Sequence, residues 1–345
     1  MNVLVTGGAG FIGSNFIHHF LEEKADISVI NVDKLTYAGN LANLENITDT
    51  ERYTFVRADI ADRKAICEIF DEYRPDAIVN FAAESHVDRS IEDAAPFIRT
   101  NVMGTQVLLA AALEFGISRF LHVSTDEVYG SLKESDPAFT ETTSLAPNSP
   151  YSASKASSDL LVYSYHKTFG LDTIITRCSN NYGPYQFPEK LIPLMISNAL
   201  KDKPLPVYGD GRNIRDWIYV TDHCRALSTL LEKGHAGEVY NIGGNSEKRN
   251  LEVVKTILQA VDKPESLIEY VKDRPGHDWR YAIDSGKMNR ETGWEPSVTF
   301  EDGLKSTVQW YMENSAWIEN VVTGEYLECY DRVYGNKKNS LKFDV

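Results

Sequence analysis

Along the first half of the chain, two patterns of hydrophobic positions alternate. Short runs rich in β-branched residues, beginning with Val3–Thr6, give way to stretches such as Phe11–Glu23, where apolar residues recur at helical spacing. The first pattern predicts strands and the second predicts helices. Further strands are expected at Ile27–Asp33, Tyr53–Arg57, Ala77–Phe81 and Phe120–Ser124, and further helices at Arg63–Tyr73, Asn101–Phe115 and Ser152–Phe169. This alternation predicts an α/β fold with a doubly wound parallel sheet.

The pattern becomes irregular after Ile174–Arg177, which is a further predicted strand. Prolines and glycines cluster there, and short strands mix with helices. The expected strands are Trp217–Val220, Val239–Ile242 and Leu267–Val271, and the expected helices are Asp222–Glu232, Leu251–Val261 and Gly303–Asn314. We therefore predict a first domain over residues 1–178 and a smaller, mixed α/β substrate-binding lobe over residues 179–345, with the stretch 216–243 returning to the first domain.

Charge and cysteine content narrow the possible partners. The formal net charge of −15 argues against a broad nucleic-acid or membrane surface, although a few convergent arginines and lysines could hold a diphosphate. The chain opens on Met1–Val5 without a basic prelude, and no apolar run is long enough to span a membrane. The four cysteines are scattered and form no CxxC pair; they are Cys67, Cys178, Cys224 and Cys329. We expect a soluble cytoplasmic protein with free thiols and no bound metal.

A glycine-rich turn follows the first predicted strand. Gly7, Gly10 and Gly13 lie between this strand and the first helix, and Gly8 completes the alternative spacing Gly-x-Gly-x-x-Gly. Glycines at such a turn let a pyrophosphate approach the backbone N–H groups at the start of the helix. The turn therefore predicts a dinucleotide site.

The ends of the next strands supply further candidates for this site. Asp33 ends the second strand, about twenty residues beyond the turn, where a dinucleotide-binding motif places an acidic residue. Its carboxylate can accept hydrogen bonds from the adenosine ribose and would repel a 2′-phosphate, which favours NAD over NADP. Asp59–Ile60 and Ala82–Ala83 follow the third and fourth strands, at the edge where such sheets bind ligands.

A tyrosine and a lysine mark a candidate catalytic centre. Tyr151 and Lys155 are four residues apart at the start of a predicted helix, so they share one face. A lysine ammonium beside a phenol favours the phenolate, and we therefore predict a lowered pKa and a role as a base for Tyr151. Thr125 ends the strand Phe120–Ser124 and could present its hydroxyl to the same substrate oxygen.

Together these motifs resemble those of the extended short-chain dehydrogenase/reductase family, over nearly the whole chain. The resemblance implies an NAD-binding, Rossmann-type sheet domain and a smaller domain that binds a nucleotide sugar. Members of this family are mostly epimerases, decarboxylases and dehydratases acting on such sugars. A non-catalytic NAD-binding regulator is a further, less favoured alternative, since a sensor has no use for a base and an acid.

Adjacent carboxyl groups at Asp126 and Glu127 favour one of these activities. An epimerase moves only a hydride at C4 and needs no acidic pair, whereas a dehydratase needs a protonated acid for the departing C6 hydroxyl and a base for the C5 proton. Repulsion between two close carboxylates, together with burial, separates their pKa values. The pair therefore favours dehydration over epimerisation or decarboxylation.

Three further runs resemble those of the dTDP-glucose 4,6-dehydratases: Asp33–Asn40, Ala82–Ser90 and Arg177–Pro184. The resemblance implies that Tyr151 removes the O4 proton, helped by Thr125 and Lys155. It further implies that Glu127 takes the C5 proton and that Asp126 protonates the leaving C6 hydroxyl.

The same resemblance implies two sets of binding residues. The NAD-binding set is Gly7, Gly10, Phe11, Ile12, Gly13, Asp33, Lys34, Leu35, Thr36, Asp59, Ile60, Phe81, Ala82, Ala83, Ser85, Thr100, Tyr151, Lys155 and Asn181. The substrate-binding set is Ser85, Thr125, Asn180, Lys190, Leu191, Pro206, Tyr208, Arg215, Asn250, Arg274 and His277. Arg215 and Arg274 are the strongest candidates to hold the diphosphate, because guanidinium pairs with phosphate in a bidentate manner. A homodimer packed through the helices at 101–115 and 152–169 is also implied.

Overall fold

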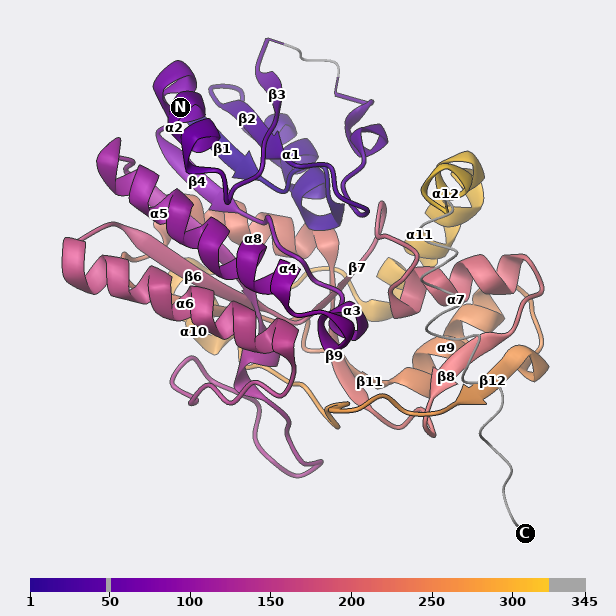
Figure 1. Ribbon diagram of the computed structural model, residues 1–345. Helices are drawn as coiled ribbons and strands as arrows, with labels where there is room; N and C mark the ends of the chain where they lie inside the picture. Colours follow the sequence, from indigo (N-terminus) through magenta and orange to yellow (C-terminus); the bar gives the residue numbers. More distant parts are fainter. Residues whose placement is uncertain (48–50, 323–345) are drawn as a thin grey trace.

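The computed structural model describes residues 1–47 and 51–322, and its centre is a seven-stranded parallel sheet (Figure 1). The strand order is β10-β6-β5-β4-β1-β2-β3. The strands are β1 (Asn2–Thr6), β2 (Ser28–Asp33), β3 (Tyr53–Arg57), β4 (Ala77–Asn80), β5 (Arg119–Thr125), β6 (Thr173–Cys178) and β10 (Val239–Ile242). Helices cover both faces of the sheet, which confirms the predicted doubly wound α/β fold.

Alternation along the strands explains why both faces are covered. On β1, Val3 and Val5 pack into the core under one helical layer, while Leu4 packs into the core under the other. Successive side chains of a strand point to opposite faces, so a run that is apolar at every position needs helices on both. One layer contains α1 (Phe11–Glu23), α8 (Val220–Lys233) and α10 (Gly286–Thr292), and the other contains α2 (Arg63–Tyr73), α5 (Thr105–Glu114) and α6 (Pro150–Phe169).

Several predicted boundaries differ from the observed ones. The helix expected at Asn101–Phe115 is the continuous run of α4 (Ala95–Phe97), a π-helical segment (Ile98–Gly104) and α5. The strand expected at Trp217–Val220 is β9 (Ile214–Tyr219), which begins earlier. A short helix, α3 (Val87–Glu92), was not predicted, since six residues are too few for helical periodicity to stand out.

The smaller lobe is built around two short sheets. One contains β7 (Asn180–Tyr182), β9 and β11 (Glu247–Arg249), and the other pairs β8 (Leu205–Tyr208) with β12 (Ile268–Val271). Its helices are α7 (Leu191–Leu200), α9 (Asn250–Ala260), α11 (Phe300–Glu313) and α12 (Ser315–Val321). Short 3₁₀ segments lie at Leu41–Leu44, Asp126–Tyr129 and Glu265–Leu267. Within the stretch 216–243, β9 belongs to this lobe, while α8 and β10 lie with the large sheet.

Among the cysteines, Cys67, Cys178 and Cys224 are free, while Cys329 and the chain after residue 322 lie outside the described residues. Across residues 1–47 and 51–322, no helix is long and apolar enough to cross a membrane. The same ranges contain no cluster of His, Cys, Asp and Glu that could hold a metal ion.

Candidate functional site

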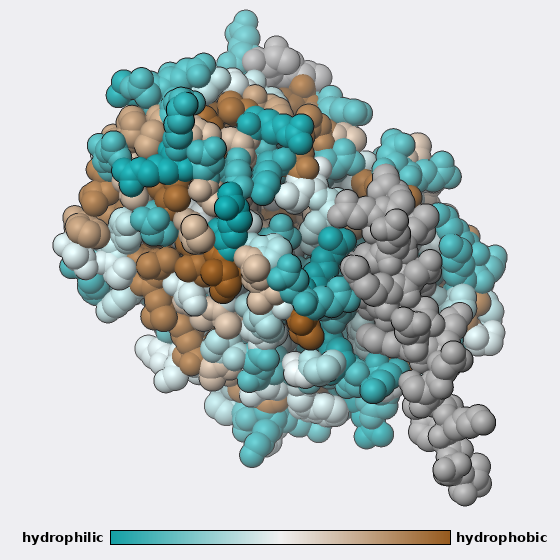
Figure 2. Space-filling view, viewed as in Figure 1, coloured by the Kyte–Doolittle hydropathy of each residue, from teal (hydrophilic) through white to brown (hydrophobic). Residues whose placement is uncertain are grey.

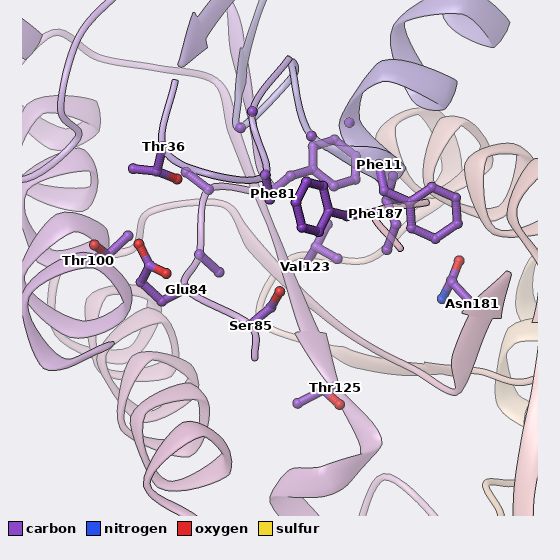
Figure 3. Close-up of a pocket in the computed structure, with 18 of the residues that line it drawn as sticks. Phe11, Thr36, Phe81, Glu84, Ser85, Thr100, Val123, Thr125, Asn181 and Phe187 are labelled. Atoms are coloured by element: carbon purple, nitrogen blue, oxygen red, sulfur yellow. The ribbon is translucent and has the colours of Figure 1, made fainter. Parts of the chain in front are cut away.

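A cavity of about 310 Å³ opens at the carboxyl edge of the large sheet, beside the smaller lobe. Segments that follow β1, β2, β3, β4 and β5 line it, together with residues 178–190. Figure 3 shows Phe11, Phe81 and Phe187 gathered on one wall, with Ser85 and Thr125 below them. The cavity thus lies where the carboxyl ends of parallel strands meet, as expected for ligand sites in such sheets.

The glycine-rich turn forms the floor of this cavity and allows little substitution. Gly7 has φ +69°, and a Cβ placed there would lie 2.6 Å from the backbone nitrogen of Ala82. A Cβ at Gly13 would lie 2.3 Å from the carbonyl oxygen of Gly7. Helix α1 begins at Phe11 directly after the turn, so its first N–H groups face the groove. This is the close backbone approach that a pyrophosphate requires.

Asp33 is held at the end of β2 by two backbone donors. Its Oδ2 accepts from the Ala9 N–H at 3.0 Å, and its Oδ1 accepts from the Leu35 N–H at 2.8 Å. Burial raises the pKa of this carboxyl, and the backbone hydrogen bonds act against the increase. Lys34 is turned to Asp59, whose carboxylate its Nζ approaches at 2.9 Å. Asp33 therefore keeps the unpaired charge that would repel a 2′-phosphate.

Eighteen of the nineteen predicted NAD-binding residues line the cavity. Leu35 is the exception: its φ of +57° turns the chain, and its side chain packs against the core beneath. The residues that do line it fit a dinucleotide, because the crowded glycine turn, the helix N-terminus and the buried carboxylate occur together in one groove.

Tyr151 and Lys155 lie on the buried face of α6 and both line the cavity. The Lys155 ammonium donates to the Val123 carbonyl at 2.8 Å, and burial lowers its pKa to about 8. Burial, followed by the charge of Glu127, raises the pKa of Tyr151 well above its usual value. The predicted lowering of the Tyr151 pKa by Lys155 is therefore wrong for the protein's own groups, since desolvation and the nearby carboxylates raise that pKa.

Asp126 and Glu127 lie on the 3₁₀ turn that follows β5, and both line the cavity. Burial, and next the charge of Glu127, raises the pKa of Asp126 well above its usual range. Burial also raises the pKa of Glu127, but Arg274, Lys190 and Arg215 act to lower it. Both pKa values are raised, but the surroundings differ: neighbouring carboxylates add to the increase at Asp126, with Arg215 opposing it, whereas three cations oppose the increase at Glu127.

The predicted substrate-binding residues divide into two groups. Ser85, Thr125, Asn180 and Lys190 line the cavity. The remaining seven lie in the smaller lobe and do not line it: Leu191, Pro206, Tyr208, Arg215, Asn250, Arg274 and His277.

Arg215 and Arg274 nevertheless lie within electrostatic reach of the cavity, since both act on the pKa of Glu127. The Arg274 guanidinium is 3.7 Å from the Asp88 carboxylate, which also accepts from the Tyr208 hydroxyl at 3.1 Å. Burial, and then the charges of the two arginines, lowers the pKa of His277 to about 4. The two arginines thus place positive charge near the acidic pair. Pro206 differs from them, because it is buried within β8.

Sequence reasoning missed Glu189, the neighbour of Lys190. Its carboxylate accepts from the Tyr37 hydroxyl at 3.1 Å, and burial raises its pKa to about 7. The His86 ring lies 3.7 Å away. Glu84 and Phe187 also line the cavity without having been predicted. Nothing in the spacing of these residues signals a site, because the chain brings them together only through its loops.

Comparison with known proteins supports the geometry. The family model described as GDP-mannose 4,6 dehydratase matches residues 4–307. The chain is 56% identical to the dTDP-glucose 4,6-dehydratase of Neisseria meningitidis serogroup B, over 94% of this chain and 97% of that protein. The solved structure of DesIV, a dTDP-glucose 4,6-dehydratase from Streptomyces venezuelae with NAD and a second ligand bound, matches with a TM-score of 0.90 at 52% identity, covering 93% of this chain and 100% of that one.

A related activity occurs on the same fold. The UDP-glucose 4-epimerase from Thermotoga maritima matches with a TM-score of 0.85 at 31% identity, covering 91% of this chain and all of that chain. The fold alone therefore does not separate dehydration from epimerisation, and the residues of the site must do so.

Proposed function

Because the chain belongs to the GDP-mannose 4,6-dehydratase family, we propose that it is an NAD-dependent dTDP-glucose 4,6-dehydratase. It converts dTDP-glucose to dTDP-4-keto-6-deoxyglucose and water. The nucleotide sugar is that of relatives more than half identical to this chain over nearly their full length.

The first step oxidises the sugar at C4. Tyr151 accepts the proton of the O4 hydroxyl, and the Thr125 hydroxyl donates a hydrogen bond to the same oxygen. Lys155, fixed on the Val123 carbonyl, keeps a positive charge beneath the tyrosine. When bound, NAD supplies a positive charge beside Tyr151, an acceptor for the C4 hydride and later a donor of hydride to C6.

The second step removes water across C5 and C6. The 4-ketone acidifies the C5 proton, which Glu127 takes as a base and returns to C5 when hydride adds at C6. Asp126 donates its proton to the C6 hydroxyl as the C–O bond breaks. The surroundings of the two groups support these roles, since burial and Glu127 raise the pKa of Asp126 well above its usual range, while Arg274, Lys190 and Arg215 oppose the increase at Glu127.

This separation of two adjacent carboxyls is the single observation that carries the proposal. An epimerase moves a hydride to and from one carbon, so it gains nothing from burying an acid and a base together beside Tyr151. Burying two carboxyls costs free energy that the fold must recover elsewhere. The buried pair therefore favours the dehydratase over the epimerase.

The double variant Asp126→Asn with Glu127→Gln tests the assignment. We expect it to reduce bound NAD on mixing with dTDP-glucose, and to release 4-keto-6-deoxy product about 100-fold or more slowly than the unaltered protein. Mass spectrometry for loss of water measures product, and nicotinamide absorbance measures oxidation. Normal product release by this variant would contradict the roles.

A homodimer and a cytoplasmic location complete the proposal. Figure 2 shows a band of hydrophobic residues on the side where α5 and α6 lie. Large apolar side chains exposed on this helical layer are Ile98, Met103, Leu113, Leu160, Tyr163 and Phe169. An exposed patch of this kind suits a second copy of the chain, and sedimentation at micromolar concentration tests it. The free thiols of the described cysteines suit a reducing compartment.

A further inference from the structure

A buried polar chain lies behind the acidic pair and is not explained by the reaction itself. Its centre is Arg177 on β6, whose register partners are Ser124 on β5 and Asn241 on β10. The Arg177 Nε donates to the Asp159 carboxylate at 2.9 Å, and its Nη1 donates to the Tyr129 hydroxyl at 3.0 Å. All three residues of this link are at most 5% exposed.

Tyr129 and Asp159, the two partners of Arg177 in this link, lie on the two elements that contain the proposed catalytic residues. Tyr129 is the last residue of the 3₁₀ turn that begins with Asp126 and Glu127. Asp159 lies one helical turn beyond Lys155 on α6, on the same face of the helix. Arg177 therefore connects the turn that contains the acidic pair with the helix that contains Tyr151 and Lys155.

Two contacts hold Tyr129 in a fixed orientation relative to Arg177. The Arg177 guanidinium lies 4.8 Å from the centre of the Tyr129 ring, so the tyrosine is held by a cation–π contact and by its hydroxyl. The hydroxyl in turn donates to the Asn241 side chain at 2.8 Å. A planar guanidinium with several fixed donors sets direction as well as distance, which a lysine in its place could not do.

Stability alone is a weak reason for such a pair. Charges this deep lose their hydration, and apolar residues of similar volume often replace buried ion pairs without loss of stability. An arrangement that costs free energy and connects two catalytic elements suggests a role in their alignment.

Resting on the proposed function, we propose that Arg177 is a positioning residue. Through Tyr129 and Asp159 it holds the acidic turn in register with the Tyr151–Lys155 helix, so that oxidation at C4 and elimination across C5 and C6 act on one bound sugar.

The test follows both steps in single turnovers of the NAD-loaded protein with dTDP-glucose. Reduced nicotinamide appears as the sugar is oxidised and disappears after elimination. Tyr129→Phe removes the hydroxyl and keeps the ring, so we expect the appearance rate to stay within about twofold while the disappearance rate falls roughly tenfold. Substrate deuterated at C5 should slow the disappearance further, which identifies elimination as the delayed step.

Asp159→Asn alters the other end of the link. Asp159 is the main group that opposes the burial-driven lowering of the Lys155 pKa, with Cys178 second. Removing its charge lowers that pKa further, so Lys155 loses its proton at lower pH. We expect the alkaline limb of the oxidation rate to move to lower pH, an effect that a merely structural role would not produce.

Tyr240→Phe is the matched control, because this buried hydroxyl donates to Glu291 at 2.7 Å, away from the link. It should leave both rates unchanged. Equal slowing of both steps by Tyr129→Phe, or no change in either step, overturns the positioning role while the function stands. Absence of turnover by the unaltered protein overturns both.

Discussion

The two halves of the cavity hold their ligand by different means. The half next to α1 uses backbone geometry: a crowded glycine turn, a helix N-terminus and the carboxylate of Asp33, itself held by two N–H groups. The half next to the smaller lobe relies on side-chain charge: Lys190 lines it, and Arg215 and Arg274 lie outside the lining but within electrostatic reach of Glu127.

The difference predicts which amino-acid substitutions each half of the cavity tolerates. A site made of backbone requires particular glycines, because added atoms collide with main chain that cannot move aside. A site made of long cationic side chains tolerates steric change but depends on charge and on the groups that hold each charge in place. Variants in one half should therefore affect NAD alone, and variants in the other should affect the sugar nucleotide alone.

The largest expected effect is in the backbone half. Gly7→Ala places a Cβ 2.6 Å from the Ala82 nitrogen at φ +69°, so the turn must distort. We expect the purified protein to contain almost no NAD and turnover to fall by more than about 1,000-fold, because the cofactor carries the hydride chemistry. Cofactor content after denaturation, measured beside the melting temperature, checks this.

Gly293→Ala is its control. Gly293 has a similar φ of +76°, but apart from its chain neighbours no atom of the described residues lies within 4 Å of the Cβ that alanine would add. Both variants carry a similar local strain, of about 1–2 kcal/mol, because an L-residue is disfavoured at positive φ. Equal loss of NAD from the two would show that strain, and not crowding, governs the cofactor site.

An intermediate effect is expected in the charged half. Arg274→Ala removes a guanidinium held beside Asp88, and we expect KM for dTDP-glucose to rise about 100-fold with NAD content unchanged. Arg274 also lowers the pKa of Glu127. Without it that pKa rises, the carboxylate forms only at higher pH, and the acid limb of the kcat profile moves to higher pH.

Arg212→Ala provides the comparison for Arg274→Ala. Arg212 is exposed and pairs with Asp210 at 2.9 Å, so its loss should leave KM and the pH profile unchanged. Loss of NAD from Arg274→Ala would mean that the two halves are not independent.

The smallest expected effect is a change in cofactor preference in the half of the cavity next to α1. Asp33→Ser removes the carboxylate but keeps a small polar side chain at the end of β2. We expect the preference for NAD over NADP to fall by about tenfold, corresponding to ~1.4 kcal/mol. Titration of cofactor-free protein with each dinucleotide measures it, and an unchanged preference would assign discrimination to another residue.

Sequence reasoning worked best where the chemistry is local. The glycine turn, Asp33 and the Tyr151–Lys155 pair are each a short segment whose spacing alone puts the groups on one turn or helix face. It worked less well for Leu35, which turns into the core, and for Glu189, which reaches the cavity through a loop. The expected lowering of the Tyr151 pKa failed because spacing reveals a neighbour but not the burial around it.

By itself, the sequence determined the parallel sheet, the position of the dinucleotide turn and the identity of the acidic pair, because these depend on periodicity and on contacts within a few residues. Tertiary structure alone decided how strongly burial acts on the two carboxyls, which arginines act on the pKa of Glu127, and how Arg177 joins β6 to α6 and to the acidic turn. Charge states and long-range links depend on desolvation and on distances between segments far apart in the chain, and both arise only when the chain packs.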